Sequence, residues 1–416
     1  MLSLVPRGIP SRLLCVTFFS HLALASEPDC ATINRANLVA CAQAHSPLLD
    51  AELASSRAAE GRREAARPFL PTNPMVTGTL GSRTGANMSA TNWSVTLAQE
   101  LELAGQSGVR VDAADKELEA QRQHVEAAKA EIAEQVWLAW FDALAAKERA
   151  ELAVRIEQAT LLVSATVQAM ASHGLASPVE AAVADATSVR ASRARLEAER
   201  DASAGEVRLR SLLGAPSRIE VAGQLEPLRS SEDVAAERPE VRALESQKQA
   251  SAGRLEVLRR SRVPNATVSL FAQNDGFDER VFGVGLGIPI PLPQPLGRTR
   301  AGEVAEAIGV QARLDHELTQ LNRNLTSDRE LAKAAWESAA QTRALYSAER
   351  LERARQGLTA ISEQLAAARV PVRDALNYQQ VLVELLQADV DARYAWCVAS
   401  VRLVRARGGS LEGGAL

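Results

Sequence analysis

The chain has 416 residues, a formal net charge of −4 and only 4% aromatic residues. Its 47 basic and 51 acidic side chains are interspersed along the sequence, which argues against a nucleic-acid-binding surface. The long runs rich in Ala, Glu, Arg, Leu and Gln are typical of long helices and coiled coils, and they exclude a thick globular core.

The N-terminus has the pattern of a secretory signal peptide, expected over residues 1–25. Two basic residues, Arg7 and Arg12, precede the apolar run Leu13–Leu24, and Ala23-Leu24-Ala25 offers a small-residue cleavage site. No later segment contains the eighteen or more apolar residues of a membrane-spanning helix. We therefore expect an exported chain.

Two cysteines, Cys30 and Cys41, follow the expected signal, and Cys397 lies near the C-terminus. A disulfide between the first two can form in an oxidising compartment. If one helix covered both, their separation would be ~16 Å, which is beyond disulfide reach. The disulfide therefore requires Cys30 to lie on a non-helical segment that folds back, and the sequence leaves both bridged and free thiols open.

The remaining chain presents one order of elements twice, and the first copy is expected over residues 26–214. A helical pattern covers Thr32 to about Arg67, where Asn34 or Ser46 could cap or restart the helix, and it ends at Pro68. A β-hairpin is expected at about 73–102. A long helical hairpin follows, and its tip, here called the first tip, is expected at about 172–179.

The second copy is expected over residues 238–408. Its β-hairpin lies at about 265–291, and its helical hairpin has a second tip at about 368–374. Residues 215–237 between the copies are expected to form a linker or small equatorial element, and residues 409–416 a tail. A repeat of this length is considered first because it decides the fold.

The strands are predicted from alternation of apolar with small or polar residues. The pattern is clearest in the second copy, where one segment alternates Phe282, Val284 and Leu286 with Gly283, Gly285 and Gly287. The strands are about ten residues long, which suits a tilted crossing of a bilayer. Four strands are too few to close a barrel alone.

The helices are unusually long. Val109–Met170 contains neither Pro nor Gly and would extend ~90 Å as one helix. Thr299–Ala368 contains no Pro and is also expected to be helical throughout, while His173-Gly174 and Val370-Pro371 are expected helix breakers. The predicted fold class is mainly α with a small β part, built from long antiparallel helical hairpins and four strands.

This order of parts resembles the TolC family of outer-membrane efflux factors over nearly the whole mature chain. The similar segments are Leu70-Pro71, His173-Gly174-Leu175-Ala176-Ser177, Arg238-Pro239-Glu240-Val241-Arg242 and Asp374-Ala375-Leu376-Asn377. The resemblance implies a homotrimer whose three protomers form one 12-stranded barrel in outer-membrane lipid, continued by a helical tube into the periplasm. It also implies two protein partners, a periplasmic adaptor (membrane fusion) protein and an inner-membrane RND-type pump.

Two segments resemble the heavy-metal branch of that family, which serves cobalt-zinc-cadmium-type or copper/silver-type pumps. Glu100-Leu101-Glu102-Leu103-Ala104-Gly105-Gln106 is similar to a bend of that branch, with Gln106 where a Lys is usual. The stretch from Ile288 to Arg298 is similar to an Ile-Pro-Leu-Pro-Leu segment, and Thr299 follows where an Asn is usual. The resemblance implies a passive duct for heavy-metal cations.

No motif for a catalytic site, cofactor or metal is present: the chain lacks a phosphate-binding loop, and none of its five His residues has a His or Cys at ligand spacing. The resemblance instead implies a gate at the tips. It aligns Glu180 with the acid of the first tip, and Asp374 and Asn377 with pore-lining positions of the second. Three copies of Asp374 would form a cation-selective ring.

Two arginines, Arg369 and Arg373, are expected to pair with Glu180 or Asp374 across the tip and hold it closed. The adaptor is expected to dock on the two turns, at His173, Gly174, Leu175, Val370 and Pro371. The other interpretation of all these residues is that they are solvated charges and helix breakers without a gate.

Two alternatives remain for the whole chain. The same architecture could serve drug export or type I protein secretion. A soluble exported coiled-coil scaffold or adhesin is the alternative of another class, and it predicts helix through residues 73–102 and 265–291.

Overall fold

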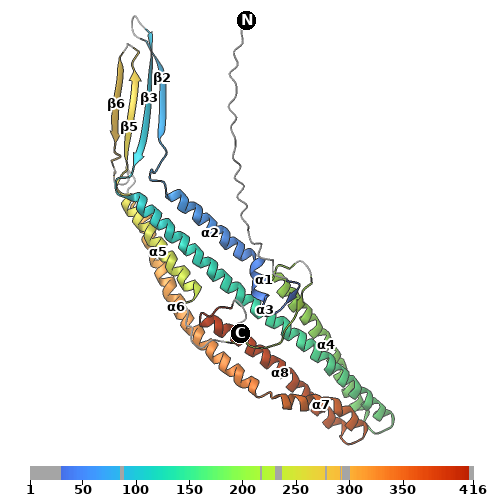
Figure 1. Cartoon of the computed structure of the whole chain (residues 1–416). Helices are drawn as coiled ribbons and strands as arrows, with labels where there is room; N and C mark the ends of the chain where they lie inside the picture. The colour runs from blue at the N-terminus through green and yellow to red at the C-terminus, as the bar shows by residue number, and fades with distance from the viewer. Residues whose placement is uncertain are drawn as a thin grey trace, which may run out of the picture.

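The computed structural model describes residues 30–84, 89–215, 218–229, 237–276, 279–290, 292 and 300–411. The chain is an elongated bundle of helices with a sheet at one end and, at the other end, two turns that each connect a pair of helices (Figure 1). The predicted fold class, mainly helical with a four-stranded antiparallel sheet, is confirmed. The expected signal peptide, most of residues 291–299 and the tail from residue 412 lie outside the described residues.

The sheet contains β2 (Met75–Thr84), β3 (Ser89–Leu101), β5 (Ala266–Asn274) and β6 (Arg280–Gly287) in the order β2-β3-β5-β6. All neighbouring strands are antiparallel. The two hairpins meet at β3 and β5, where Trp93 lies opposite Asn274 and Leu101 opposite Ala266. Residues 73–102 and 265–291 are therefore not continuous helix, contrary to the scaffold alternative.

The strand register gives the sheet one apolar and one mostly polar face, because residues directly opposite each other share a face. The apolar face carries Val76, Leu80, Trp93, Val95, Leu97, Val268, Leu270, Ala272, Phe282, Val284 and Leu286. The other face carries Thr77, Thr79, Ser94, Thr96, Ser269, Gln273, Gly283 and Gly285. Within one chain the apolar face is uncovered, since Leu80 is 80% and Val284 71% exposed.

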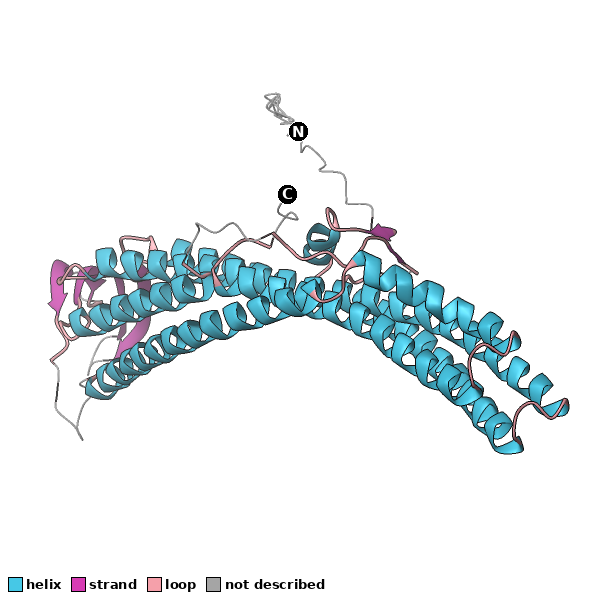
Figure 2. Cartoon of the chain, turned by 90° about the horizontal axis from the view of Figure 1, so that it is seen from below, coloured by secondary structure: helices cyan, strands magenta, loops and turns pink. Residues whose placement is uncertain are grey.

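Seven helices make up most of the bundle: α2 (Pro47–Ala66), α3 (Gln106–Ser172), α4 (Pro178–Leu212), α5 (Pro239–Arg260), α6 (Ala301–Ala344), α7 (Ala348–Ala366) and α8 (Val372–Ala406). Helix α3, with 67 residues, is about 100 Å long and packs against α2, α4, α5, α7 and α8. Figure 2 shows the helices running side by side from the sheet to the turns. None of the helices in the described part is long and apolar enough to cross a membrane.

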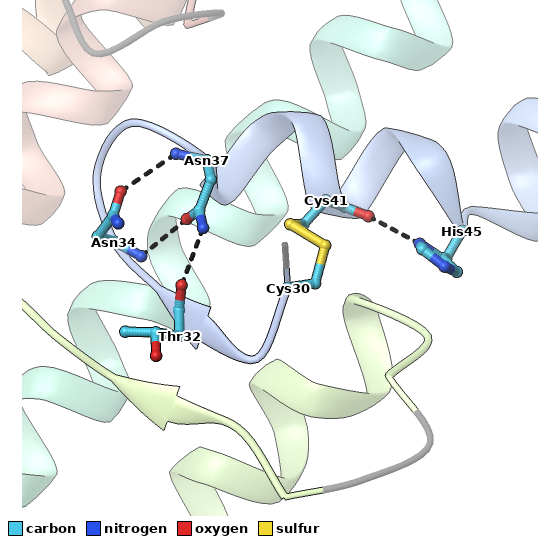
Figure 3. Close-up of a disulfide and its surroundings, with 6 residues drawn as sticks. All are labelled: Cys30, Thr32, Asn34, Asn37, Cys41 and His45. Atoms are coloured by element: carbon cyan, nitrogen blue, oxygen red, sulfur yellow. Dashed lines mark hydrogen bonds between the residues drawn. A yellow bond between two sulfur atoms is a disulfide. The ribbon is translucent and has the colours of Figure 1, made fainter. Parts of the chain in front are cut away.

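The expected helix over Thr32–Arg67 is wrong at its beginning. Strand β1 (Thr32–Ile33) and the short helix α1 (Leu38–Ala44) precede α2, and β1 pairs in parallel with β4 (Glu220–Val221). The helix cannot begin earlier because Asn34 and Asn37 hydrogen-bond each other's backbone N–H groups, at 2.8 and 3.3 Å, and form a turn (Figure 3).

This turn brings Cys30 back onto α1, where it forms a disulfide with Cys41, with the Cα atoms 5.9 Å apart (Figure 3). The disulfide therefore uses the non-helical segment that the sequence required for it. His45 extends this contact, because its ring Nδ1 lies 3.4 Å from the Cys41 carbonyl oxygen.

The expected helix over Thr299–Ala368 is also interrupted. Helix α6 ends at Ala344 and α7 begins at Ala348, although residues 345–347 contain neither Gly nor Pro. Ser347 starts the new helix, because its hydroxyl accepts a hydrogen bond from the Arg350 N–H at 3.3 Å.

The main core lies halfway along the molecule, around Trp137, Trp140 and Phe141 of α3. Strands β1 and β4 cover this cluster, and the C-terminal segment does so too, because Trp137 Nε1 donates to the Leu411 carbonyl at 3.0 Å. Both ends of the described chain therefore pack on the core in the middle of the bundle.

Candidate functional site

The first and second tips lie together at the end of the bundle far from the sheet (Figure 1). One apolar cluster joins them and contains Val163, Val167, Ala184, Ile361, Leu365, Val372 and Ala375, from α3, α4, α7 and α8. The structure thus brings the predicted residues of both tips into one region. Their proposed roles are not tested by this proximity alone.

The first tip begins where α3 ends. Gly174 has φ +74°, a left-handed conformation that glycine adopts without steric cost. The Leu175 N–H then donates to the Met170 carbonyl at 2.8 Å, which closes a Schellman motif. His173 ends the helix, and the Leu175 side chain is 71% exposed. His173, Gly174 and Leu175 therefore form an accessible turn.

Glu180 belongs to the start of α4 and completes a capping box. Ser177 N–H donates to Glu180 Oε2 at 2.7 Å, and the Glu180 N–H donates to Ser177 Oγ at 3.2 Å. The backbone hydrogen bond from Ser177, followed by the bond from its hydroxyl, lowers the pKa of Glu180. The Glu180 carboxylate therefore stabilises the turn of the first tip.

The second tip repeats the geometry of the first. Ala368 has φ +54° and occupies the place of Gly174, and the Arg369 N–H donates to the Gln364 carbonyl at 2.9 Å. Pro371 caps α8, and the half-buried Val370 packs against the shared apolar cluster. Asp374 is the third residue of α8, as Glu180 is of α4.

The charges of the second tip are mostly solvent-facing. Arg369, Arg373 and Asn377 are exposed, and Asp374 is half-buried. Among the described residues neither arginine forms an ion pair, so the expected pairing with Glu180 or Asp374 is not made within one chain. For Glu180 the reason is the competing capping box with Ser177.

Two features of the site were not identified in the sequence. The capping box had a local signal, the spacing Ser177-x-x-Glu180. The second feature had no local sequence signal. Gln379 of α8 is 3% exposed and donates to Thr160 Oγ1 of α3 at 2.7 Å, and the two residues are 219 positions apart in the sequence. This bond forms a buried polar layer next to the apolar cluster of the tips.

The tips offer a binding surface rather than a catalytic or metal site. In the described part of the chain, no three His, Cys, Asp or Glu side chains converge as metal ligands would. The groups that the tips do offer are backbone turns, two free arginines and one half-buried carboxylate.

Comparison with known proteins gives a family match and a fold match. Residues 38–215 match the family model described as "Outer membrane efflux protein". No curated protein matches the sequence at a significant level. Among solved structures, CusC, studied for folding and transmembrane channel formation, has a TM-score of 0.75 at 16% identity, covering 90% of this chain and 92% of that chain.

Two further structures match similarly. VceC, an outer membrane protein of Vibrio cholerae, has a TM-score of 0.70 at 18% identity, covering 90% of this chain and 96% of its own. The open state of the Neisseria gonorrhoeae MtrE outer membrane channel has a TM-score of 0.69 at 18% identity, covering 91% and 90%. At these identities the structures establish the shared fold.

Proposed function

We propose that this chain is an outer-membrane efflux channel of the TolC family, with a periplasmic helical extension, and that it acts as the passive exit duct of a tripartite efflux system. Channels of this family are not enzymes. The observation that carries the proposal is the amphipathic sheet at one end of the bundle, whose apolar face is uncovered within one chain.

The sheet supports assembly into a trimer. Its outer strands, β2 and β6, each have one side without a partner strand among the described residues. Such open edges are covered or paired in native proteins. Three copies would pair them in one 12-stranded barrel with the apolar face toward outer-membrane lipid and the polar face toward the lumen.

The two ends of the molecule are compatible with the proposed partners. With the barrel in the outer membrane, the tips point into the periplasm, toward an adaptor and an inner-membrane RND-type pump. The exposed turns at His173, Gly174, Leu175, Val370 and Pro371 would form the docking surface for the adaptor.

We assign the gate to the second tip. Asp374 of each protomer would contribute to a ring of carboxylates, which favours cations, while Glu180 would act by stabilising the first tip. In planar bilayers we expect Asp374→Ala to lower the cation-to-anion permeability ratio. The matched control is Asp201→Ala, an exposed acid of α4 far from the tips. An unchanged permeability ratio in Asp374→Ala would contradict the proposed ring of Asp374 carboxylates.

We propose heavy-metal cations as cargo, on the similarity of the bend at residues 100–106. In this bend Gly105 has φ +64° and Gln106 Nε2 donates to Asn265 Oδ1 at 3.2 Å, which connects α3 to the second hairpin. The test is growth of a channel-deficient host on cobalt, copper and drugs with matched pumps. Resistance to drugs alone would assign the duct to drug export.

The first experiment is outer-membrane fractionation, followed by gels of unheated and boiled samples. A detergent-resistant trimer in the outer-membrane fraction is the expected result. A soluble, elongated periplasmic species would reject the duct and favour the scaffold alternative.

A further inference from the structure

The break between α6 and α7 lies in a segment that could form one helix. Residues 345–347 contain no Gly or Pro, the two residues to which sharp helix interruptions are usually due. The equivalent helix of the first repeat, α3, runs unbroken for 67 residues. Helices α6 and α7, with 44 and 19 residues, would together span nearly that length. The interruption therefore has to be held by something else.

Side chains stabilise the interruption between α6 and α7. Arg343 Nη1 donates to the Tyr346 carbonyl, and Arg350 Nη1 donates to the Leu345 carbonyl at 2.7 Å. Ser347 adds the cap of α7. These groups replace the backbone hydrogen bonds that the break removes, because in a continuous helix the same two carbonyls would accept from the N–H groups of residues 349 and 350.

Arg343 also faces a second acceptor. Its Nη1 lies 3.6 Å from Oδ1 of Asp389 on α8, and this oxygen has no hydrogen bond although Asp389 is only 4% exposed. The other oxygen accepts from Arg393 at 3.2 Å. A buried acceptor without a donor is unfavourable. If residues 345–347 became helical, Arg343 would be released from the Tyr346 carbonyl and could donate to Asp389 instead.

Packing does not prevent this rearrangement. A cavity of about 900 Å³ lies beside the break and is lined in part by Arg343, Ala348, Leu351, Asp389 and Trp396. Protein interiors are normally close-packed, which fixes one arrangement of side chains. Leu345 is largely solvent-exposed, so of the apolar residues in the segment only Tyr346, which packs on the cluster around Leu351 and Leu386, loses a contact when the segment moves.

Helices α6 and α7 together have backbone strain at both outer ends. Arg300, before α6, and Ala368, after α7, have positive φ, whereas Gly105 and Gly174 occupy the equivalent places around α3. A side chain in this conformation is strained where glycine is not. The first repeat is thus relaxed at these positions and the second is not.

We propose that residues 345–347 are a two-state hinge, in which the bent, arginine-capped form exchanges with a continuous helix over residues 301–366. The Arg343 side chain is the switching group: in the bent state it caps Tyr346 while it lies 3.6 Å from Asp389 Oδ1, and in the continuous helix it would donate a hydrogen bond to Asp389. Exchange would rotate α7 and the second tip relative to α6. This inference does not depend on the transported substrate or on the trimer.

The test uses spin-label distances across the hinge in the purified full chain, diluted with unlabelled chain. Lys333→Cys on α6 and Arg353→Cys on α7 are both exposed label sites. In a continuous helix they would be ~30 Å apart along the axis. Native thiols do not interfere, because Cys30 and Cys41 are bonded and burial raises the pKa of Cys397 to about 12.

Two substitutions move the equilibrium in known directions. Ser347→Ala removes the cap of α7 and improves helix propensity, so the ratio of long to short distance should rise on the order of tenfold. Ala348→Pro should leave only the short distance, because Pro is tolerated at the first position of a helix but not inside one.

The matched control is Ser46→Ala, which removes the same kind of cap from α2, where Pro47 already prevents a continuous helix. This variant should keep the distances of the unaltered chain. One identical distance distribution in Ser347→Ala and Ala348→Pro would overturn the hinge. Conductance plays no part in the readout, so failure of the proposed duct and failure of the hinge are distinguishable.

Discussion

At the residue scale, Ala368 is the strained position of the second tip. Its φ of +54° costs an L-residue about 1–2 kcal/mol, and glycine would relieve that strain while adding entropy to the unfolded chain. We expect Ala368→Gly to raise the free energy of unfolding by roughly 0.5–1 kcal/mol in denaturant titrations followed by circular dichroism. Gly174→Ala, the matched change in the first tip, should lower it. Equal effects of the two changes would contradict the equivalence of the tips.

The capping box of Glu180 predicts an acid-sensitive first tip. Because the folded pKa is lowered, its contribution to stability is complete above the ordinary value near 4.5 and is lost as pH falls through the lowered value. We expect hydrogen exchange at residues 174–184 to accelerate on acidification through this range, after correction for the intrinsic rate. Glu180→Gln should lack this step, since the amide binds no proton there. An identical acid response in both proteins would exclude the carboxylate as its cause.

At the scale of the elements, the proposed barrel would place the two faces of the sheet in two environments, lipid and lumen. An Arg on the lipid-facing side of a barrel destabilises insertion by about 2–4 kcal/mol near the bilayer centre. We therefore expect Val284→Arg, on the apolar face, to reduce the folded fraction in lipid vesicles by at least tenfold. Thr77→Arg, on the polar face, is the control and should insert like the unaltered chain. The opposite ranking would reverse the assignment of the faces.

At the scale of the whole molecule, the disulfide holds the N-terminal segment against the core in the middle of the bundle. Cys30 precedes β1, and β1 pairs with β4 from the linker between the repeats, so the bond limits how far both can separate from the core. Closing a short loop of this kind stabilises by about 2–3 kcal/mol. Reduction should lower the denaturant midpoint of the wild-type chain accordingly. The reductant should have no effect on the doubly substituted Cys30→Ser/Cys41→Ser chain.

Much of the architecture could be predicted from short-range patterns. The alternation around Phe282 and Val284 identified a strand, and the Pro-free run through α3 identified a long helix, because period and chain breakers are properties of neighbouring residues. The turn at Gly174 was predicted for the same reason. The capping box at Ser177 was equally readable, although only the resemblance suggested a role for Glu180.

The contacts that the sequence did not predict join residues far apart in the chain. Pairing of β1 with β4, the Thr160–Gln379 layer and the approach of Arg343 to Asp389 all depend on how the helices pack. The interruption at residues 345–347 was missed for that reason, since its local sequence permits helix. The expected ion pairs of Arg369 and Arg373 are not formed within one described chain, and for Glu180 the competing partner is Ser177, which the expected pairing did not take into account.

By itself, therefore, the sequence determined the four strands of the sheet, most of the long helices and the two turns, since each depends on the preferences of adjacent residues and on hydrophobic period. Only the tertiary structure decided the order of the four strands, the apolar face of the sheet, the disulfide and the groups that hold the α6–α7 break. These depend on free energies of packing and charge pairing between segments that a linear pattern does not place together.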